Sequence, residues 1–202
     1  GVHHRPADAV MAVLINPFRF GPGQPTWNSA DKDSDIALSD GDRTATATNG
    51  GGVRSVSSIS TGLRYVEAPW VTINSGANGR FGIANASFTI TGAPGGDTNS
   101  WCIQGDGDKI TNNTAASYGT AFSNGDVCML ALNLTSGKVW FGNNGTWFNS
   151  GDPAAGTNEA YSSLTGPLYL VFGRASGSDR AITLQTVGSY AYTPPTGFTK
   201  GW

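Results

Sequence analysis

The alternation of apolar and polar residues predicts a chain built from short strands. From Thr26 onward, short apolar runs are separated by turn dipeptides such as Asp40-Gly41, Asn78-Gly79 and Asn144-Gly145. Closely spaced strands of this kind are typical of a β-sandwich or a jelly roll. The predicted strands are Ile36–Ser39, Arg43–Thr48, Tyr65–Ile73, Gly79–Ala84, Ala86–Ile90, Ser100–Gln104, Val127–Leu134, Lys138–Phe141, Leu168–Phe172 and Ala181–Thr186.

Residues 126–146 give the clearest local pattern in the chain. Two apolar runs flank Thr135-Ser136-Gly137, and the second run ends at Asn144-Gly145. Turn residues between strand-like runs predict an antiparallel hairpin followed by a further reversal of the chain. In this hairpin the residues expected to pack in the core are Val127, Leu130, Leu132, Val139 and Phe141.

Composition favours the same all-β class. The 202 residues include 29 Gly, only 13% are charged, and Glu67 and Glu159 are the only glutamates. Long helices therefore lack good surface residues, whereas Val, Thr and the aromatic residues suit strands. We expect one β-sandwich domain over residues 25–202, preceded by an N-terminal arm and linker over residues 1–24.

The arm contains the apolar run Ala9–Ile15, which follows Asp8 and precedes Asn16-Pro17. At this length periodicity does not separate a short capped helix from a buried strand. The arm either packs on its own sandwich or docks on another subunit or a larger assembly. The start of the chain shows no signal-peptide pattern, and no apolar run is long enough to predict membrane insertion.

Charge and cysteine content narrow the choice of partner. The formal net charge is −2 and the basic residues are scattered singly, which argues against nucleic-acid binding. Cys102 and Cys128 lie in predicted strands, where the simplest interpretation is two small buried residues; the sequence leaves a disulfide between them open. No metal or other cofactor is expected.

One segment has the oxygen spacing of a calcium loop. Asp31, Asp33 and Asp35, with Ser39 and Asp42, occupy positions 1, 3, 5, 9 and 12 of such a loop. However, Ile36 stands where the loop requires glycine for its sharp turn. A bend followed by a strand explains the segment better.

The order of several motifs resembles the SPRY family. Ser60-Thr-Gly-Leu-Arg-Tyr65-Val-Glu67, Gly82-Ile-Ala84 and the Gly125-Asp126 hairpin ending in Lys138-Val-Trp-Phe141 are similar to successive family motifs. Tyr192-Thr-Pro-Pro-Thr-Gly-Phe198 is similar to a tail found on SPRY proteins in bacteriophage and bacterial genomes. The resemblance spans roughly residues 26–198. It departs from the family pattern at Pro69, which cannot donate to a ladder and so indicates an edge strand or a bulge.

This resemblance implies a twisted sandwich of two antiparallel sheets, related to concanavalin-like lectins. It also implies a binding module, with ligands held across loops at one end of the sandwich. Two loops carry the residues suited to such a site, because aromatic groups beside Asn and Asp hold sugars or peptide side chains. The alternative for Trp147 is that it folds back and caps the sandwich end. The candidate ligand-binding residues are Trp147, Phe148, Asn149 and Asp152 in the loop 143–158, and Asp106, Asp108, Asn112 and Tyr118 in the loop 105–118.

The sequence thus predicts a non-enzymatic binding or structural module. We expect a bacteriophage virion protein, such as a tail-fibre, tail-tip or capsid-decoration domain, located in the virion or outside the cell. Its partner would be a protein or a cell-surface glycan, with other virion proteins bound through the arm. The alternative is a secreted or intracellular SPRY module that binds a protein or glycan.

A carbohydrate-active enzyme is a more distant alternative. Glycoside hydrolysis needs two carboxyl groups held across one sugar bond, and no paired spacing of Glu67 or Glu159 suggests this. The only histidines, His3 and His4, lie at the N-terminus, so no internal histidine could activate a serine nucleophile.

Overall fold

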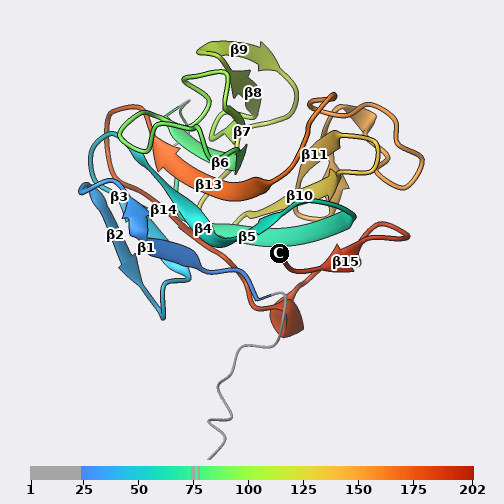
Figure 1. Cartoon of the computed structure of the whole chain (residues 1–202), viewed down its shortest axis with the longest axis horizontal. Coiled ribbons are helices and arrows are strands. Elements are labelled where there is room, and N and C mark those ends of the chain that lie inside the picture. Colours follow the sequence, from blue (N-terminus) through green and yellow to red (C-terminus); the bar gives the residue numbers. More distant parts are fainter. Residues whose placement is uncertain (1–23, 74–75, 77) are drawn as a thin grey trace, which may run out of the picture.

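Two β-sheets packed face to face form the fold (Figure 1). The computed structural model describes residues 24–73, 76 and 78–202. The first sheet has seven strands, in the order β1-β4-β13-β6-β7-β8-β9. Its strands are β1 (Trp27–Lys32), β4 (Gly52–Ile59), β13 (Leu168–Arg174), β6 (Gly79–Ala84), β7 (Ser100–Gln104), β8 (Asp108–Thr111) and β9 (Thr114–Ser117).

The second sheet follows the order β12-β11-β10-β5-β14-β3-β2, with β15 beside β5. All its neighbours are antiparallel except β15, which pairs parallel to β5. Two short 3₁₀ turns, Phe148–Ser150 and Val187–Ser189, complete the regular structure of the described residues. The strands are β12 (Thr146–Trp147), β11 (Lys138–Asn143), β10 (Val127–Asn133), β5 (Leu63–Thr72), β14 (Arg180–Thr183), β3 (Thr44–Ala47), β2 (Ile36–Ser39) and β15 (Thr199–Lys200).

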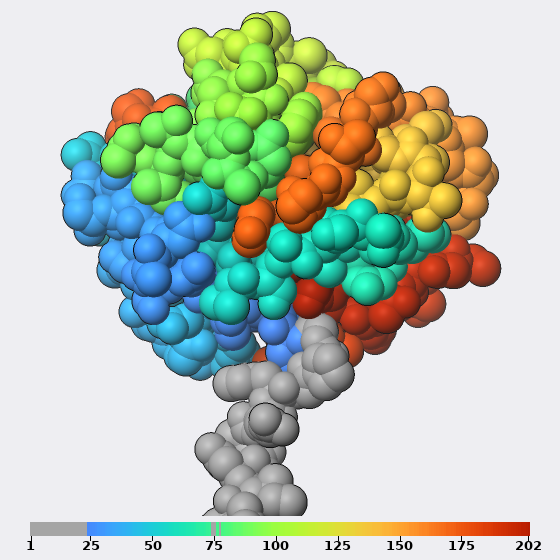
Figure 2. Space-filling view, viewed as in Figure 1, coloured from blue at the N-terminus to red at the C-terminus, as the bar shows by residue number. Residues whose placement is uncertain are grey.

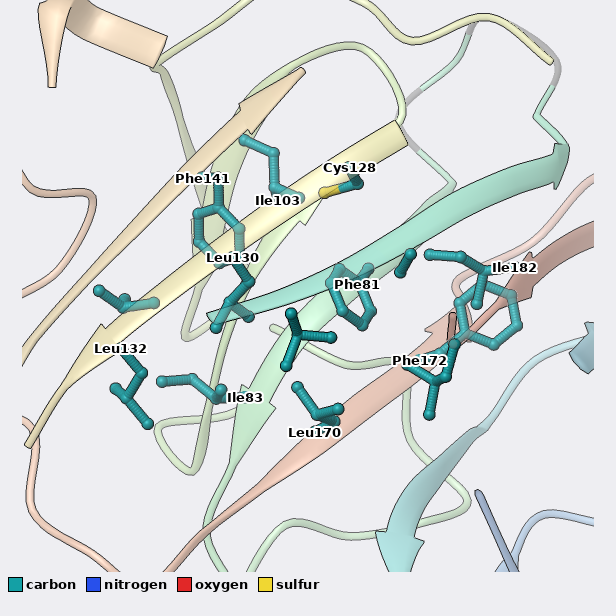
Figure 3. Packing of buried hydrophobic residues seen from close by; sticks show 14 of the residues in the cluster. Phe81, Ile83, Ile103, Cys128, Leu130, Leu132, Phe141, Leu170, Phe172 and Ile182 are labelled. Atoms are coloured by element: carbon teal, nitrogen blue, oxygen red, sulfur yellow. The ribbon is translucent and has the colours of Figure 1, made fainter. Parts of the chain in front are cut away.

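The main core lies between the two sheets (Figure 3). Alternate residues of β10, such as Leu130 and Leu132, point into it and are fully buried, because successive side chains of a strand face opposite sides. From the facing sheet, Phe81 and Phe172 enter the same layer. Burial of each such side chain stabilises the folded state by about 1.5–3 kcal/mol. The two packed sheets confirm the predicted all-β sandwich.

The predicted hairpin is formed by β10 and β11, with Leu130 opposite Phe141 and Leu132 opposite Val139. These four residues are fully buried, as expected. Val127 is only partly buried and packs on the outer side of the sheet instead. The next reversal, Asn144-Gly145, has φ values of 49° and 86°, which a two-residue type I′ turn requires.

Pro69 lies inside the sheet and not at its edge. β5 pairs with β10 from Leu63 to Pro69 and then with β14. The β14 register shifts between Ala181, opposite Thr72, and Ile182, opposite Trp70. Of the two alternatives that the sequence allowed for this strand, the sheet edge is wrong for Pro69, and an irregular register follows it between Trp70 and Thr72.

Most of the remaining predicted strands are present, and Ala86–Ile90 is the exception. This segment is a turn because the Asn85 side chain accepts a hydrogen bond from the Ser87 amide at 2.8 Å, and the Asn85 carbonyl accepts one from the Phe88 amide. Phe88 is buried for a different reason: it packs on the outer face of the first sheet. Strands without a strong apolar pattern were missed, among them β1, β4, β8 and β9.

The C-terminal segment covers the outer face of β5, β10 and β11. Phe198 packs on Trp140 with ring centroids 6.5 Å apart, and β15 follows directly. The last residue, Trp202, returns to the main core. Cys102 and Cys128 are both buried and free, which resolves the question of a disulfide.

The N-terminal arm falls outside the described residues, apart from Gln24, whose side chain accepts a hydrogen bond from the Val187 amide at 2.9 Å. The question of helix or strand for Ala9–Ile15 therefore lies outside the described residues too. Within residues 24–73, 76 and 78–202, no helix has the length and apolar character needed to cross a membrane.

Candidate functional site

The two loops singled out in the sequence pack against each other at one end of the sandwich. The Tyr118 ring meets the Phe148 ring edge-on, with centroids 6.2 Å apart and planes at 90°. The Tyr118 hydroxyl donates a hydrogen bond to the Asn158 carbonyl at 3.1 Å. The loops 105–118 and 143–158 therefore form one continuous surface.

Tyr118 and Phe148 form the floor beneath this surface. Each side chain is only 6% exposed, and both belong to the main core. Burial raises the pKa of the Tyr118 hydroxyl, which keeps it protonated as a donor. Gly119 is needed beside them, because a Cβ at this position would lie 2.3 Å from the Phe148 ring. These two aromatic residues hold the loops together from below.

Trp147 points to the opposite side of the second sheet from Phe148. Its ring packs on Tyr65, with centroids 6.2 Å apart and planes at 72°. Partly buried Tyr190 and Tyr192, from the C-terminal segment, join the same cluster. Trp147 and Phe148 are adjacent in sequence, but their rings do not form one aromatic surface. Phe148, and not Trp147, packs into the end of the main core.

The exposed part of loop 143–158 is held in an unusual backbone conformation. Asn149 and Ser150 are consecutive left-handed residues, with φ values of 53° and 52°, and Asn158 has a φ of 54°. The Asn158 side-chain amide donates a hydrogen bond to the Ser150 carbonyl at 3.0 Å, which connects the two sides of the loop. Left-handed residues other than glycine are uncommon and concentrate where a site demands a fixed backbone.

Asp152 is used mainly to shape this loop. Its Oδ1 atom accepts hydrogen bonds from the amides of Ala154 and Ala155, both at 3.0 Å. Asp152 also pairs with Thr157 through an isolated β-bridge. Its carboxylate faces solvent, so the second oxygen is accessible to a ligand.

The other loop is the β8–β9 hairpin with the turn that precedes it. Asp106 accepts a hydrogen bond from the Asp108 amide at 3.1 Å, and Asn112 and Asn113 form the tight turn at the tip, with φ values of 48° and 54°. Lys109 joins the hairpin to the segment just after loop 143–158 by donating a hydrogen bond to the Ala160 carbonyl at 2.8 Å.

A family comparison gives the context of this geometry. The model of the SPRY domain family matches residues 70–185, which is more than half of the chain. The chain belongs to the SPRY domain family. SPRY domains are protein-interaction modules, so the general prediction of a binding module is confirmed at that level. A search of curated protein sequences gave no match.

Solved structures share this SPRY fold at low sequence identity. The SPRY domain of human HERC1 is 13% identical, with a TM-score of 0.66, and the match covers 81% of this chain and 99% of that one. The TRIM65 PSpry domain is 19% identical, with a TM-score of 0.61 and coverage of 80% and 92%. Stonustoxin is 17% identical, with a TM-score of 0.59; the match covers 80% of this chain but only 27% of the toxin chain.

The structure of this SPRY domain places the eight predicted site residues at two locations. Seven of them lie on or beneath the surface formed by the two loops, and Trp147 lies on the outer sheet face. Sequence reasoning missed Tyr190 and Tyr192, which the C-terminal segment places beside Trp147. The family-like tail that contains Tyr192 was a signal, but no local pattern showed that it returns to this face. Ligand binding by the eight residues stays a prediction.

The glutamates are occupied elsewhere in this SPRY domain. Glu67 is fully buried and accepts hydrogen bonds from the amides of Ala191 and Tyr192 at 2.7 and 2.8 Å. Glu159 forms an ion pair with Lys138 at 3.2 Å. Each carboxylate has a structural partner.

The segment with calcium-like spacing is also explained by internal contacts. Asp31 pairs with the Arg54 guanidinium at 2.7 and 3.0 Å, and Asp33 accepts from the Asp35 amide at 2.8 Å. Within the part of the chain that the structure describes, no three His, Cys, Asp or Glu residues are grouped so as to hold a metal.

Proposed function

We propose that this SPRY domain is a bacteriophage virion protein that binds the host surface or another particle component through the surface formed by loops 105–118 and 143–158. One observation carries the proposal: exposed polar residues, most of them uncharged, lie above the buried aromatic rings of Tyr118 and Phe148. Such a surface presents fixed hydrogen-bonding groups at little entropic cost on binding.

Most of the exposed polar side chains on this surface are uncharged, and Asp152 adds one exposed carboxylate. Asn112, Asn113, Asn149, Ser150 and Asn158 are all exposed and offer amide, hydroxyl and backbone groups, while the neighbouring Lys138 and Glu159 neutralise each other. Hydroxyl-rich glycans and polar peptide loops make hydrogen bonds of this kind. The low overall charge and the phage-like tail Tyr192–Phe198 support the virion setting.

Particle association is tested directly. Phage particles are purified from a strain that carries the coding sequence, and peptides of the chain are sought by mass spectrometry. We expect the chain in the particle fraction, and an antibody against it should reduce adsorption to host cells. Absence from purified particles, together with presence in the soluble fraction, would support a secreted or intracellular module instead.

The binding surface is tested with Asn149→Gly. This change removes the side-chain amide but tolerates the left-handed backbone. Ser163→Gly is the matched control, because Ser163 is also exposed with a φ of 61° but lies outside both loops. The loss of one hydrogen bond weakens binding by about threefold to tenfold.

Binding of both variants is measured on arrays of bacterial surface polysaccharides and on immobilised host-envelope protein. Loss with Asn149→Gly alone supports the surface, and equal binding by the two variants contradicts it. Glycan signal without protein signal, or the reverse, identifies the class of partner.

A further inference from the structure

The edge strand β9 is the least protected sheet edge in the described part of the chain. All four of its residues, Thr114, Ala115, Ala116 and Ser117, are exposed. The strand contains no charge, proline or bulge, and it pairs regularly with β8 along its whole length. In Figure 2 the yellow-green β8–β9 hairpin projects at the top of the molecule. Natural sheets usually block such an edge, because it is a template for another strand.

The other three ends of the two sheets show these protections. β1 has an irregular register against β4 and carries Asp31 and Lys32. β2 has one of its carbonyls, that of Ile36, occupied by the Lys32 ammonium at 2.8 Å. β12 has only two residues, and the adjoining turn lies against the Tyr192 ring. The bare edge of β9 is therefore a local exception.

The hairpin geometry determines which groups β9 offers. Thr111 and Thr114 are partners on either side of the two-residue turn. A hairpin with a two-residue turn closes on a pair that exchanges both hydrogen bonds, and bonded pairs then recur at every second residue. Ala116 consequently bonds to β8, whereas the N–H and C=O groups of Ala115 and Ser117 point away from β8. Two residues with outward groups, separated by one residue, are the minimum needed for a further strand.

We propose that β9 pairs with β9 of a second copy of this chain, antiparallel and centred on Ala116. In this register Ala115 bonds to Ser117 of the other copy and Ser117 to Ala115, so all outward groups of both residues are satisfied. Ala116 faces its own equivalent, where a small side chain permits close approach. The two seven-stranded sheets become one continuous sheet of fourteen strands. A two-fold contact of this type is self-complementary.

The sequence of β9 suits a second copy better than an unrelated segment. Every residue that would face the other copy is small, and the absence of charge removes like-charge repulsion between identical strands. Four residues on each side form a small contact compared with a stable interface of about 800 Å² per partner. We therefore expect reversible association, which repeated copies in a particle would strengthen. The inference does not depend on the proposed virion function.

Cysteine cross-linking tests the register. In Ala116→Cys the new thiols of two copies lie opposite each other at a non-bonded pair, about 4.5–5.5 Å apart at Cβ, whereas in Thr114→Cys they do not. The native Cys102 and Cys128 are buried and leave the test undisturbed. Because disulfide closure needs a Cβ separation of about 4 Å, we expect the dimer of Ala116→Cys to form about tenfold faster than that of Thr114→Cys. Equal rates would overturn the register.

Charge variants test whether the occupant is a second copy. Ala116→Lys and Ala116→Glu should each abolish the concentration-dependent association that sedimentation equilibrium detects in the unmodified chain up to about 1 mM. An equimolar mixture should restore it, because opposite charges then meet across the two-fold axis. A monomeric unmodified chain throughout this range, or a mixture that stays monomeric, would overturn the proposal. Thermal melting confirms that both variants are folded.

Discussion

The Tyr65 hydroxyl donates a hydrogen bond to Oε1 of Glu67 at 2.8 Å, two residues further along β5 and on the same outer face. Glu67 then accepts the amides of Ala191 and Tyr192 from the C-terminal segment. One buried carboxylate thus fixes the segment that covers the outer face. The family-like motif that ends at Glu67 and the tail motif that begins at Tyr192 are thus joined by the hydrogen bond between these two residues.

Replacement of Glu67 should release this cover. In Glu67→Ala the buried Tyr65 hydroxyl and the part-buried amides of Ala191 and Tyr192 lose their hydrogen bonds to a carboxylate, and each such bond contributes about 1.5–3 kcal/mol. We expect a loss of at least 3 kcal/mol in the free energy of unfolding, measured by urea denaturation.

Glu159→Ala is the control for this change, because its ion pair with Lys138 is partly exposed, unlike the fully buried Glu67. Exposed pairs contribute about 0–1 kcal/mol. If both variants lost a similar amount of stability, Glu67 would not anchor the C-terminal segment as described.

The packing of the two candidate loops can be disturbed through Gly119. A Cβ at this position would lie 2.3 Å from the Phe148 ring, so Gly119→Ala should push the ring and its loop away. Overpacking of this kind costs about 1–3 kcal/mol. Thermal melting measures the loss, and binding by the loop surface should weaken at temperatures where the variant is still folded.

Gly188→Ala serves as the reference, since a Cβ at that glycine would meet no atom within 4 Å. Its stability should stay within about 0.5 kcal/mol of the unmodified chain. A stable Gly119→Ala variant with unchanged binding would show that the two loops act independently of Phe148.

The sequence predicted the sandwich because apolar alternation is strong where strands are buried, as in β10 with Leu130 and Leu132. It failed where the apolar pattern along a strand is weak. β9 reads Thr-Ala-Ala-Ser and is exposed throughout, so no apolar pattern could mark it. Ala86–Ile90 failed in the opposite sense, because Phe88 is buried from a turn.

The candidate site was predictable only in part. Turn residues and aromatics located the two loops, and their contact through Tyr118 and Phe148 follows from the fold. The side of the sheet on which the Trp147 ring lies was not predictable. Trp147 ends a two-residue strand and Phe148 begins a 3₁₀ turn, and so short a segment has no pattern that shows which of the two residues faces the core. Its partners Tyr190 and Tyr192 come from a distant segment, and local sequence contains no information on that contact.

Titration of Asp126 should make the free energy of unfolding depend on pH in the acid range. Its partial burial favours the neutral form, but hydrogen bonds from the Ser123 amide at 2.7 Å and from the side chains of Asn143 and Asn144 at 3.1 and 2.7 Å outweigh this and lower its pKa. A lowered folded-state pKa means that the stabilisation is complete above the unfolded value, near 3.9, and is lost as the pH falls through the folded value.

Urea denaturation between about pH 2 and pH 6 measures this effect. Asp126→Asn removes the titrating group, so its unfolding free energy should fall less steeply below about pH 4 than that of the unmodified chain. Parallel pH profiles for the two proteins would exclude a contribution from Asp126.

The two thiols should not react with thiol reagents in the folded protein. Cys102 and Cys128 are fully buried, and burial raises the pKa of both thiols, so neither access nor thiolate is available to a reagent. With a chromogenic disulfide reagent we expect no fast reaction in the native state and two thiols per chain after denaturation. Reaction in the native state then requires opening of the fold. If loosening of the C-terminal segment in Glu67→Ala spreads to β10, which carries Cys128, the labelling rate of that variant should increase. A rate unchanged by that variant, despite its lower stability, would confine the loosening to the C-terminal segment.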